Sequence, residues 1–240
     1  MASATGRYQI AFNGEIYNHQ ALRRELEAAG LVRRSWCGHS DTETLLAAIE
    51  AWGLEAALQR CAGMFALALW DRSHQQLQLA RDRFGEKPLY WGRLQIAGSQ
   101  VLVFGSELAA LRTVPGATPL AVDQAALASY FLGGCLPAPL CIHAGIQQLP
   151  PGHWLEFAPG AEGCAPAQLP EPKPWWDLAA AAQAAQAHAT ASPNWSEAQE
   201  PVSSGCVRLP FRRARCAHPC RPVAQSLRRT AQPARDGSPP

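Results

Sequence analysis

The chain of 240 residues has no apolar run that approaches the roughly 18 consecutive residues needed to cross a membrane. Its N-terminus also lacks the charged segment followed by an apolar stretch that marks a secretory signal peptide. These two absences disfavour a membrane protein and ordinary secretion, so we expect a cytoplasmic location. Hydrophobic residues still make up 48% of the chain, which is enough for a packed core.

The C-terminal third is poor in the side chains that build a core. Residues 161–240 hold eight Ile, Leu, Val or Phe residues, whereas residues 1–160 hold 40. Residues 161–240 also hold 12 of the 20 Pro residues, and residues 201–240 contain eight Arg, no Lys and one acid, Asp236. Such a segment cannot offset its ordering entropy by burying apolar surface. The composition therefore predicts a compact domain over residues 7–160 and a low-complexity, disordered tail over residues 161–240.

Within the first 160 residues, the hydrophobic pattern predicts both strands and helices. Short apolar runs predict strands over residues 8–12, 64–71, 76–82, 101–104 and 153–157. Helical spacing and capping signals predict helices over residues 18–30, 40–53, 55–60, 107–111 and 122–131. Propensity alone predicts a weak helix over residues 179–191. Because the strands come in hairpins, this pattern predicts α+β layers of largely antiparallel sheets.

Two short segments carry candidate chemistry. Asn13-Gly14 predicts a tight turn at the end of the first strand, but it also offers an amide and a backbone N–H as two donors for an acyl-transfer oxyanion. Glu15 adds a carboxylate beside them. Asp41, in the capping-box pattern of residues 40–43, is either a structural cap or a partner for the ammonium of a small amino acid. From the residues alone, both interpretations stay open.

Seven of the eight cysteines fall into two groups, and neither group indicates a metal site. Without a secretion signal, buried or free thiols are favoured over disulfides; the first group comprises Cys37, Cys61, Cys135 and Cys141. The second group is the only metal-like cluster, and it comprises Cys206, Cys216, His218 and Cys220. Its spacing lacks the paired C-x-x-C elements of a structural zinc site.

Six phrases occur in order and at compatible spacing between residues 7 and 157. They are residues 12–18 (FNGEIYN), 38–43 (GHSDTE), 63–71 (GMFALALWD), 80–92 (ARDRFGEKPLYWG), 104–107 (FGSE) and 149–153 (LPPGH). Together they resemble the class II glutamine amidotransferase domain of glutamine-hydrolysing asparagine synthetases. The KPLYWG phrase favours this branch over sugar-phosphate or purine amidotransferases.

The resemblance implies a fold, a site and a reaction. The fold is a four-layer αββα sandwich of antiparallel sheets, like that of N-terminal-nucleophile hydrolases, and incomplete here. Asn13 and Gly14 would form the oxyanion hole, while Glu15 and Asp41 would hold L-glutamine, with Asp41 paired to its ammonium. In the family, an N-terminal Cys attacks the side-chain amide with its own α-amine as base, and ammonia leaves for a second domain. The implied function is the glutaminase portion of an asparagine synthase-like ligase, whose parent reaction is ATP-dependent amidation of aspartate in amino-acid biosynthesis.

The chain departs from the family pattern at both ends. It starts Met1-Ala2-Ser3, so the family's nucleophile is missing, as is the first strand pair, which would leave residues 8–12 and 64–70 as sheet edges. No Ser-Gly-Gly-x-Asp-Ser loop for ATP follows. We therefore expect no cofactor in this chain, with ATP and Mg²⁺ confined to a missing synthetase domain, and no activity of the chain alone. A misplaced start codon and a frameshift beyond about residue 188 are hypotheses that the coding DNA tests.

Two other function classes remain as alternatives. The first is a non-catalytic pseudo-enzyme module that binds glutamine or a partner; a separate synthetase domain and a homodimer are the partners considered. The second is nucleic-acid binding through residues 201–240 of the tail, whose net charge is +7. A single aromatic residue, Phe211, lies among its arginines and no recognised binding module accompanies it, so this class is disfavoured.

Overall fold

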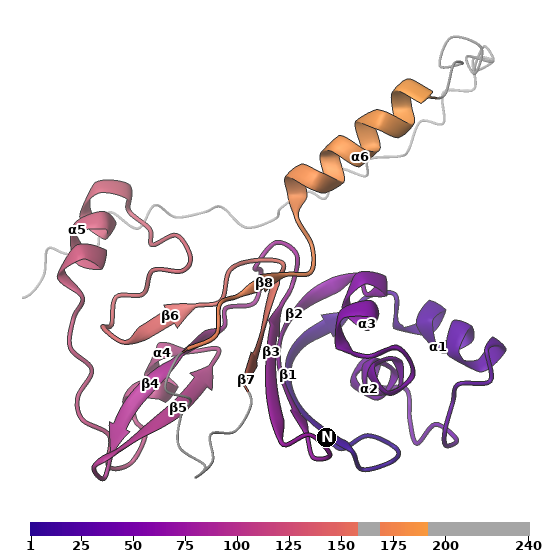
Figure 1. Ribbon diagram of the computed structural model, residues 1–240, viewed down its shortest axis with the longest axis horizontal. Helices are drawn as coiled ribbons and strands as arrows, with labels where there is room; N and C mark the ends of the chain where they lie inside the picture. The colour runs from indigo at the N-terminus through magenta and orange to yellow at the C-terminus, as the bar shows by residue number, and fades with distance from the viewer. Residues whose placement is uncertain (158–168, 192–240) are drawn as a thin grey trace, which may run out of the picture. The chain divides into compact units, whose positions relative to one another are not determined.

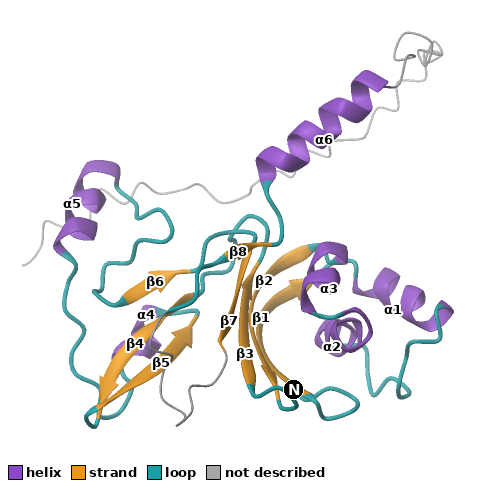
Figure 2. Cartoon of the chain, viewed as in Figure 1, coloured by secondary structure: helices purple, strands orange, loops and turns teal. Residues whose placement is uncertain are grey.

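The computed structural model describes residues 1–157 and 169–191, which form two antiparallel sheets with helices packed on the outer face of each, while the helix of residues 178–191 projects away from them (Figures 1 and 2). The first sheet has the order β1 (Tyr8–Ile16), β2 (Gly63–Asp71), β3 (Gln76–Arg81), β7 (His153–Phe157) and β8 (Lys173–Pro174). The second sheet has the order β5 (Ser99–Gly105), β4 (Tyr90–Ile96) and β6 (Ile146–Gln148). The helices are α1 (His19–Ala28), α2 (Asp41–Trp52), α3 (Leu54–Arg60), α4 (Leu108–Arg112), α5 (Gln124–Gly133) and α6 (Leu178–Ala191).

Three hydrophobic clusters hold the layers together. The first fills the space between α1–α3 and one face of the first sheet, where Phe65, Leu67 and Leu69 alternate along β2. The second joins the opposite face of that sheet to the second sheet, with Trp91 almost fully buried at its centre. The third packs Leu111 of α4 against the outer face of the second sheet. The expected α+β, αββα arrangement of antiparallel sheets is therefore confirmed.

The predicted turn at Asn13-Gly14 is wrong, because β1 continues through both residues to Ile16. Local propensity favoured a turn, but a close approach between strands requires the glycine. A Cβ on Gly14 would lie 2.1 Å from the carbonyl oxygen of Met64 on the partner strand. Gly63 on β2 is under the same constraint, because a Cβ there would lie 2.1 Å from the carbonyl oxygen of Glu15. The two glycines let the backbones of β1 and β2 meet at this end.

β2 is not a sheet edge, contrary to expectation. It lies between β1 and β3, with Leu67 opposite Phe12 on one side and Ala80 on the other. Only β1 is at the edge of the sheet at this side. The expectation assigned an edge position to both strands, whereas β2 keeps a neighbour on each side.

The helix starts follow the capping signals in part. Ser40 caps α2 by accepting a hydrogen bond from the Thr42 N–H at 3.2 Å, and Asp123 caps α5 by accepting from the Ala126 N–H. Asn18 precedes α1 but does not cap it: its side chain binds the backbone of residues 60–62 instead. The second hydrogen bond of a capping box, from the Ser40 N–H to Glu43, is also missing. The Glu43 carboxylate accepts hydrogen bonds from the N–H groups of Cys37 and Gly38 instead.

The loop after β3 is held by two buried charged side chains. The carboxylate of Asp82, 1% exposed, accepts hydrogen bonds from four backbone amides, those of Phe65, Phe84, Glu86 and Lys87. The guanidinium of Arg81 donates to three backbone carbonyls, those of Gly85, Lys87 and Leu149. Burial lowers the pKa of Arg81 from its usual value. This pair explains, in structural terms, why an Arg-Asp phrase stands between two strands.

The ordered part of the chain reaches beyond the expected boundary at residue 160. β8 pairs with β7, and Trp175 is 5% exposed, with its ring stacked on Phe65 and its indole N–H donating to the Arg81 carbonyl at 3.1 Å. The weak helix expected over residues 179–191 is present as α6. Composition averaged over 80 residues hid this segment, although its paired tryptophans were a signal. The Cys/His cluster and the +7 segment lie outside the described residues.

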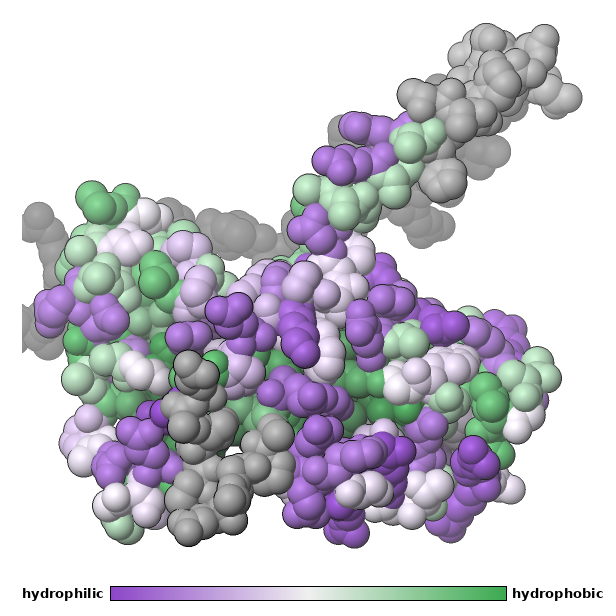
Figure 3. All heavy atoms as spheres, in the orientation of Figure 1, coloured by the Kyte–Doolittle hydropathy of each residue, from purple (hydrophilic) through white to green (hydrophobic). Residues whose placement is uncertain are grey.

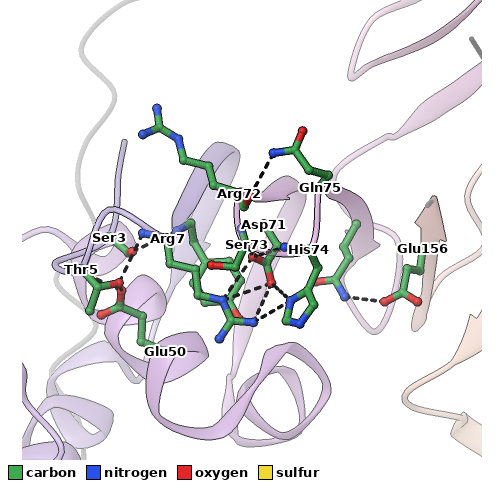
Figure 4. A network of polar contacts seen from close by, with 12 residues as sticks. Ser3, Thr5, Arg7, Glu50, Asp71, Arg72, Ser73, His74, Gln75 and Glu156 are labelled. Atoms are coloured by element: carbon green, nitrogen blue, oxygen red, sulfur yellow. Dashed lines mark hydrogen bonds and ion pairs between the residues drawn. The ribbon is translucent and has the colours of Figure 1, made fainter. Parts of the chain in front are cut away.

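Polar contacts join the start of β1 to the β2–β3 hairpin (Figure 4). Arg7 donates to both carboxylate oxygens of Asp71, the shorter contact being 2.7 Å, and the His74 ring lies 2.9 Å from the same carboxylate. Hydrogen bonds from Arg7 hold the pKa of Asp71 well below its usual range. Beside them, Thr5 donates to the carboxylate of Glu50 on α2.

α5 carries a group of exposed apolar side chains. Tyr130, Phe131 and Leu132 are 47%, 79% and 91% exposed, and hydrophobic residues gather over this helix at the upper left of Figure 3. Over residues 1–157 and 169–191, no helix combines the length and apolarity needed to span a membrane.

Candidate functional site

The outer edge of β1 is covered at its first half by the N-terminal residues. The Ile10 N–H donates to the Met1 carbonyl and the Met1 ammonium donates to the Ile10 carbonyl, both at 2.9 Å. Ser3 and Tyr8 are joined in the same way, the Ser3 N–H donating to the Tyr8 carbonyl and the Tyr8 N–H to the Ser3 hydroxyl. Tyr8 and Ile10 therefore direct their backbone groups away from β2.

The same edge is covered at its far end by a carboxylate. The Ile16 N–H donates to Oδ2 of Asp41 at 2.9 Å. Since backbone groups alternate in direction along an antiparallel strand, Phe12 and Gly14 also face this edge. No other part of the described chain bonds to their backbone N–H or carbonyl groups. The edge is thus open over residues 12–14, between two covered ends.

Asp41 is the first residue of α2, and its carboxylate is only partly engaged. Besides the Ile16 N–H, it accepts hydrogen bonds from the N–H of Thr42 at 2.7 Å and from the Thr42 hydroxyl. A carboxylate offers about four acceptor positions, so one more donor can be accommodated. The N-terminus of α2 stabilises the negative charge. Asp41 can therefore act as a cap and still bind a cationic group.

Asn13 and Glu15 both have exposed side chains. Because side chains alternate along a strand, they share the face of β1 opposite the helices, in register with Ala66 and Met64 of β2. The structure therefore places the four predicted residues near one end of β1. The Asn13 and Glu15 side chains share one face, and the Gly14 N–H lies at the open edge. Asp41 contacts the strand at Ile16, two residues beyond Gly14. Two neutral donors beside two carboxylates suit a ligand with an amide at one end and an ammonium at the other.

A cavity of about 390 Å³ lies between residues 1–4, the loop that connects α1 to α2, and one face of α2. Its apolar lining includes Leu31, Val32, Trp36 and Leu46. Asn13, Gly14, Glu15 and Asp41 are not among the residues that line it. The predicted residues therefore belong to the strand edge and its surroundings and do not line this cavity.

No thiol of the described residues is placed on β1. Cys37 is exposed and stands in the loop before Asp41, where its N–H donates to Glu43. Cys61 is buried, which raises its pKa to about 12, and burial also raises the pKa of Cys141. Within the described ranges, no group of three or more His, Cys, Asp and Glu side chains is arranged to hold a metal ion.

Arg23 is a residue near the site that the sequence analysis did not single out. It belongs to α1, its side chain is 14% exposed, and its guanidinium contacts the loop that leads to Asp41. The sequence indicates no special role for Arg23, because it is one of two adjacent arginines in a helix with ordinary amphipathic spacing. The only sequence signal was a charged residue one position after the core residue Leu22.

Comparison with known proteins identifies similar sequences over most of the chain. The family described as "glutamine amidotransferase domain" matches residues 1–167. Asparagine synthetase [glutamine-hydrolyzing] 1 of Bacillus subtilis is 36% identical over 155 residues, which are 65% of this chain and 23% of that protein. Asparagine synthetase [glutamine-hydrolyzing] 3 of the same organism is 38% identical over 152 residues, or 63% of this chain and 23% of that protein. The chain spans about a quarter of the length of these relatives.

Among solved structures, a glutamine phosphoribosylpyrophosphate amidotransferase from B. subtilis, complexed with ADP and GMP, is similar with a TM-score of 0.47. It is 21% identical in sequence, and the alignment covers 73% of this chain and 31% of that one.

Proposed function

Because the chain belongs to the glutamine amidotransferase domain family, we propose that the open segment of β1 binds L-glutamine. The observation that carries this proposal is the unpaired N–H of Gly14, which faces an edge that is closed on one side by Asp41. In the proposed complex, the Asp41 carboxylate binds the α-ammonium of glutamine, and Glu15 contributes a second carboxylate. The Asn13 amide and the Gly14 N–H face the side-chain carbonyl.

The Asn13 amide and the Gly14 N–H are two neutral donors on adjacent residues, the kind of groups that stabilise the oxyanion of a tetrahedral intermediate. In the proposed parent reaction, a thiol nucleophile attacks the glutamine amide, the negative charge on the carbonyl oxygen is bound by these two donors, and ammonia departs. The residues described here supply the binding and the charge stabilisation. No thiol stands on β1 with them, so we propose that the chain of 240 residues alone releases negligible ammonia.

The use of the ammonia is a further part of the proposal. By analogy with relatives named asparagine synthetases, the ammonia would amidate aspartate in a synthetase domain that binds ATP and Mg²⁺. That domain would belong to a separate chain or a longer form of this protein, or act within a homodimer. The described residues contribute no group to this second step.

Isothermal titration of the full chain with L-glutamine tests the binding proposal. We expect Asn13→Ala and Asp41→Asn to weaken binding by about tenfold or more, since each removes a hydrogen bond to a polar or charged ligand group. Gln9→Ala is the matched control, an exposed residue on the same face of β1, and it should leave binding unchanged. If the unaltered chain does not bind glutamine, or if all three variants bind it equally, the site is wrongly assigned.

A coupled assay for ammonia tests the catalytic half separately. The chain should release ammonia from glutamine no faster than buffer does. Sustained release that is lost in Asn13→Ala but retained in Gln9→Ala would show that a nucleophile is present after all, and would contradict that half of the proposal.

A further inference from the structure

The position of Asp41 depends on a loop that lacks regular secondary structure. Between the end of α1 at Ala28 and the start of α2, residues 31–40 form neither helix nor strand. Such a segment has no repeating backbone hydrogen bonds to fix its path. Besides the packing of α2 in the core, side chains that bind this loop therefore help to set the place where α2 begins, and with it the carboxylate of Asp41.

One side chain binds the loop at several points. From α1, the guanidinium of Arg23 donates through Nη1 to the Gly38 carbonyl at 2.8 Å and through Nη2 to the Ser40 carbonyl at 3.3 Å. Its Nε donates to the hydroxyl of Thr44, a fully buried residue in the first turn of α2, at 3.2 Å. The planar fork of an Arg can make such contacts together, which a Lys ammonium cannot do in the same geometry.

The carboxylate of Glu43 also binds this loop and lies close to Arg23. Oε2 of Glu43 lies 3.7 Å from Nη2 of Arg23. The Glu43 carboxylate also accepts hydrogen bonds from the N–H groups of Cys37 and Gly38, at 2.7 and 3.1 Å. The Arg23 guanidinium stacks on the ring of Trp36, 4.1 Å from its centroid. The Arg23 guanidinium therefore contacts two carbonyls and an aromatic ring of the loop, and the neighbouring Glu43 carboxylate binds two of its amides.

The contacts that Arg23 makes with the loop end at Ser40, one residue before Asp41. The Ser40 carbonyl that Arg23 holds belongs to the residue preceding Asp41, and Ser40 is the cap of α2. Asp41 in turn reaches the Ile16 N–H and closes the edge of β1. An unbroken series of contacts runs from Arg23 through Ser40 to Asp41 and then to Ile16, two residues from Gly14.

We infer that Arg23 is a positioning residue: it fixes the start of α2 so that the carboxylate of Asp41 stands at the open edge of β1, where it selects ligands carrying an α-ammonium. The ligand half of this inference rests on the proposed function. Arg23 itself touches neither β1 nor the proposed ligand position. Its effect on binding passes through Asp41 alone.

Amide hydrogen exchange of the full chain tests the positioning without any ligand. In Arg23→Gln, the Ile16 amide should exchange at least about tenfold faster, because its acceptor on Asp41 is no longer held. The Ala11 amide in the centre of β1 should keep its rate, which separates local loosening from unfolding of the strand. Arg24→Gln, which changes an exposed residue on the same helix, is the matched control and should change neither rate.

Arg23→Lys covers the case in which Arg23→Gln does not fold. It keeps the positive charge and loses the fork, so Ile16 should again exchange faster than in the unaltered chain. Unchanged Ile16 exchange in a folded Arg23 variant overturns the inference, whatever the chain binds.

Ligand selectivity tests the second half. The unaltered chain should prefer L-glutamine over its analogue lacking the α-ammonium, 5-amino-5-oxopentanoate. Arg23→Gln should lose about tenfold of that preference, with the affinity for the analogue unchanged, as should Asp41→Asn. If Asp41→Asn loses the preference and Arg23→Gln keeps it, Arg23 does not position the carboxylate. If the unaltered chain binds neither ligand, the proposed function fails, and with it this half of the inference, while the exchange result still decides whether Arg23 places Asp41.

Discussion

Replacing Gly14 with Ala provides the sharpest test of how β1 forms the site. The added Cβ would lie 2.1 Å from the Met64 carbonyl oxygen and 2.6 Å from the Cα of Phe65, both backbone atoms that cannot rotate away. Gly14 also has a φ of 154°, a value that L side chains rarely adopt. The substitution thus meets a steric and a conformational obstacle at once.

The size of the effect follows from both obstacles. Cβ contacts shorter than 3.0 Å essentially do not occur, so the strands must separate by about 1 Å or more at Gly14, which weakens ladder hydrogen bonds worth about 1 kcal/mol each. The unfavourable φ adds roughly 1 to 3 kcal/mol. We expect Gly14→Ala to lower the free energy of unfolding by about 3 kcal/mol or more. With a urea slope of about 2 kcal/mol per molar, the unfolding midpoint should fall by about 1.5 M.

Urea unfolding of the full chain, followed by tryptophan fluorescence, measures this midpoint. Gly38→Ala is the matched control, because a Cβ there would meet no atom within 4 Å and its φ is not in the positive range. Its midpoint should stay close to that of the unaltered chain. Equal midpoints for Gly14→Ala and Gly38→Ala would refute the close approach of β1 and β2, and the turn predicted from Asn13-Gly14 would have to be reconsidered.

Three further predictions concern other parts of the fold. Trp175→Ala should destabilise the chain by about 3 to 5 kcal/mol in the same titration, as expected for a buried aromatic side chain; a loss below 1 kcal/mol would show that the segment after residue 168 is not part of the core. Because the folded-state pKa of Asp71 is depressed, its stabilisation is fully present above the usual Asp pKa near 4 and is lost as pH falls below it. Arg7→Gln should therefore flatten the fall in melting temperature between about pH 4 and pH 2, and an unchanged slope would contradict the pairing. In native protein at pH 8, iodoacetamide should modify the exposed Cys37 and spare Cys61, whose burial raises its pKa to about 12; equal labelling of both by peptide mass mapping would rule out the burial.

Most elements with strong local signals were predictable from the sequence. The helix from Asp41 to Trp52 was expected from its apolar stripe and terminal glycine, and the hairpin of β2 and β3 from two apolar runs around a short polar loop. Signals that depend on distant partners were not. Glu43 has the spacing of a capping box, yet its carboxylate binds Cys37 and Gly38, because Arg23 from another helix draws it there. β8 pairs with β7 through two residues only, too few for any pattern to show.

The residues of the candidate site stay a prediction that comes from the resemblance, and their geometry could not be read from the sequence. Resemblance to a family pointed to Asn13, Gly14, Glu15 and Asp41, whereas local rules alone favoured a turn and a helix cap. Neither source showed that the N–H of Ile16 joins the two segments. That hydrogen bond spans 25 positions in the sequence, and its existence depends on the sheet edge that the N-terminal residues leave uncovered.

An exposed strand edge normally invites pairing with another extended chain. On β1, the Met1–Ile10 contacts cover one end and the Asp41–Ile16 hydrogen bond covers the other. Among the contacts of residues 1–157 and 169–191, only residues 12–14 stay open, a length of about 10 Å at the rise of an antiparallel strand. An extended peptide needs a longer edge to pair, but a single amino acid with an amide side chain fits this length. The carboxylate that protects the edge is also the group proposed to bind the ligand's ammonium, so in the proposed complex the contact that keeps a strand away from β1 would also favour a small zwitterion.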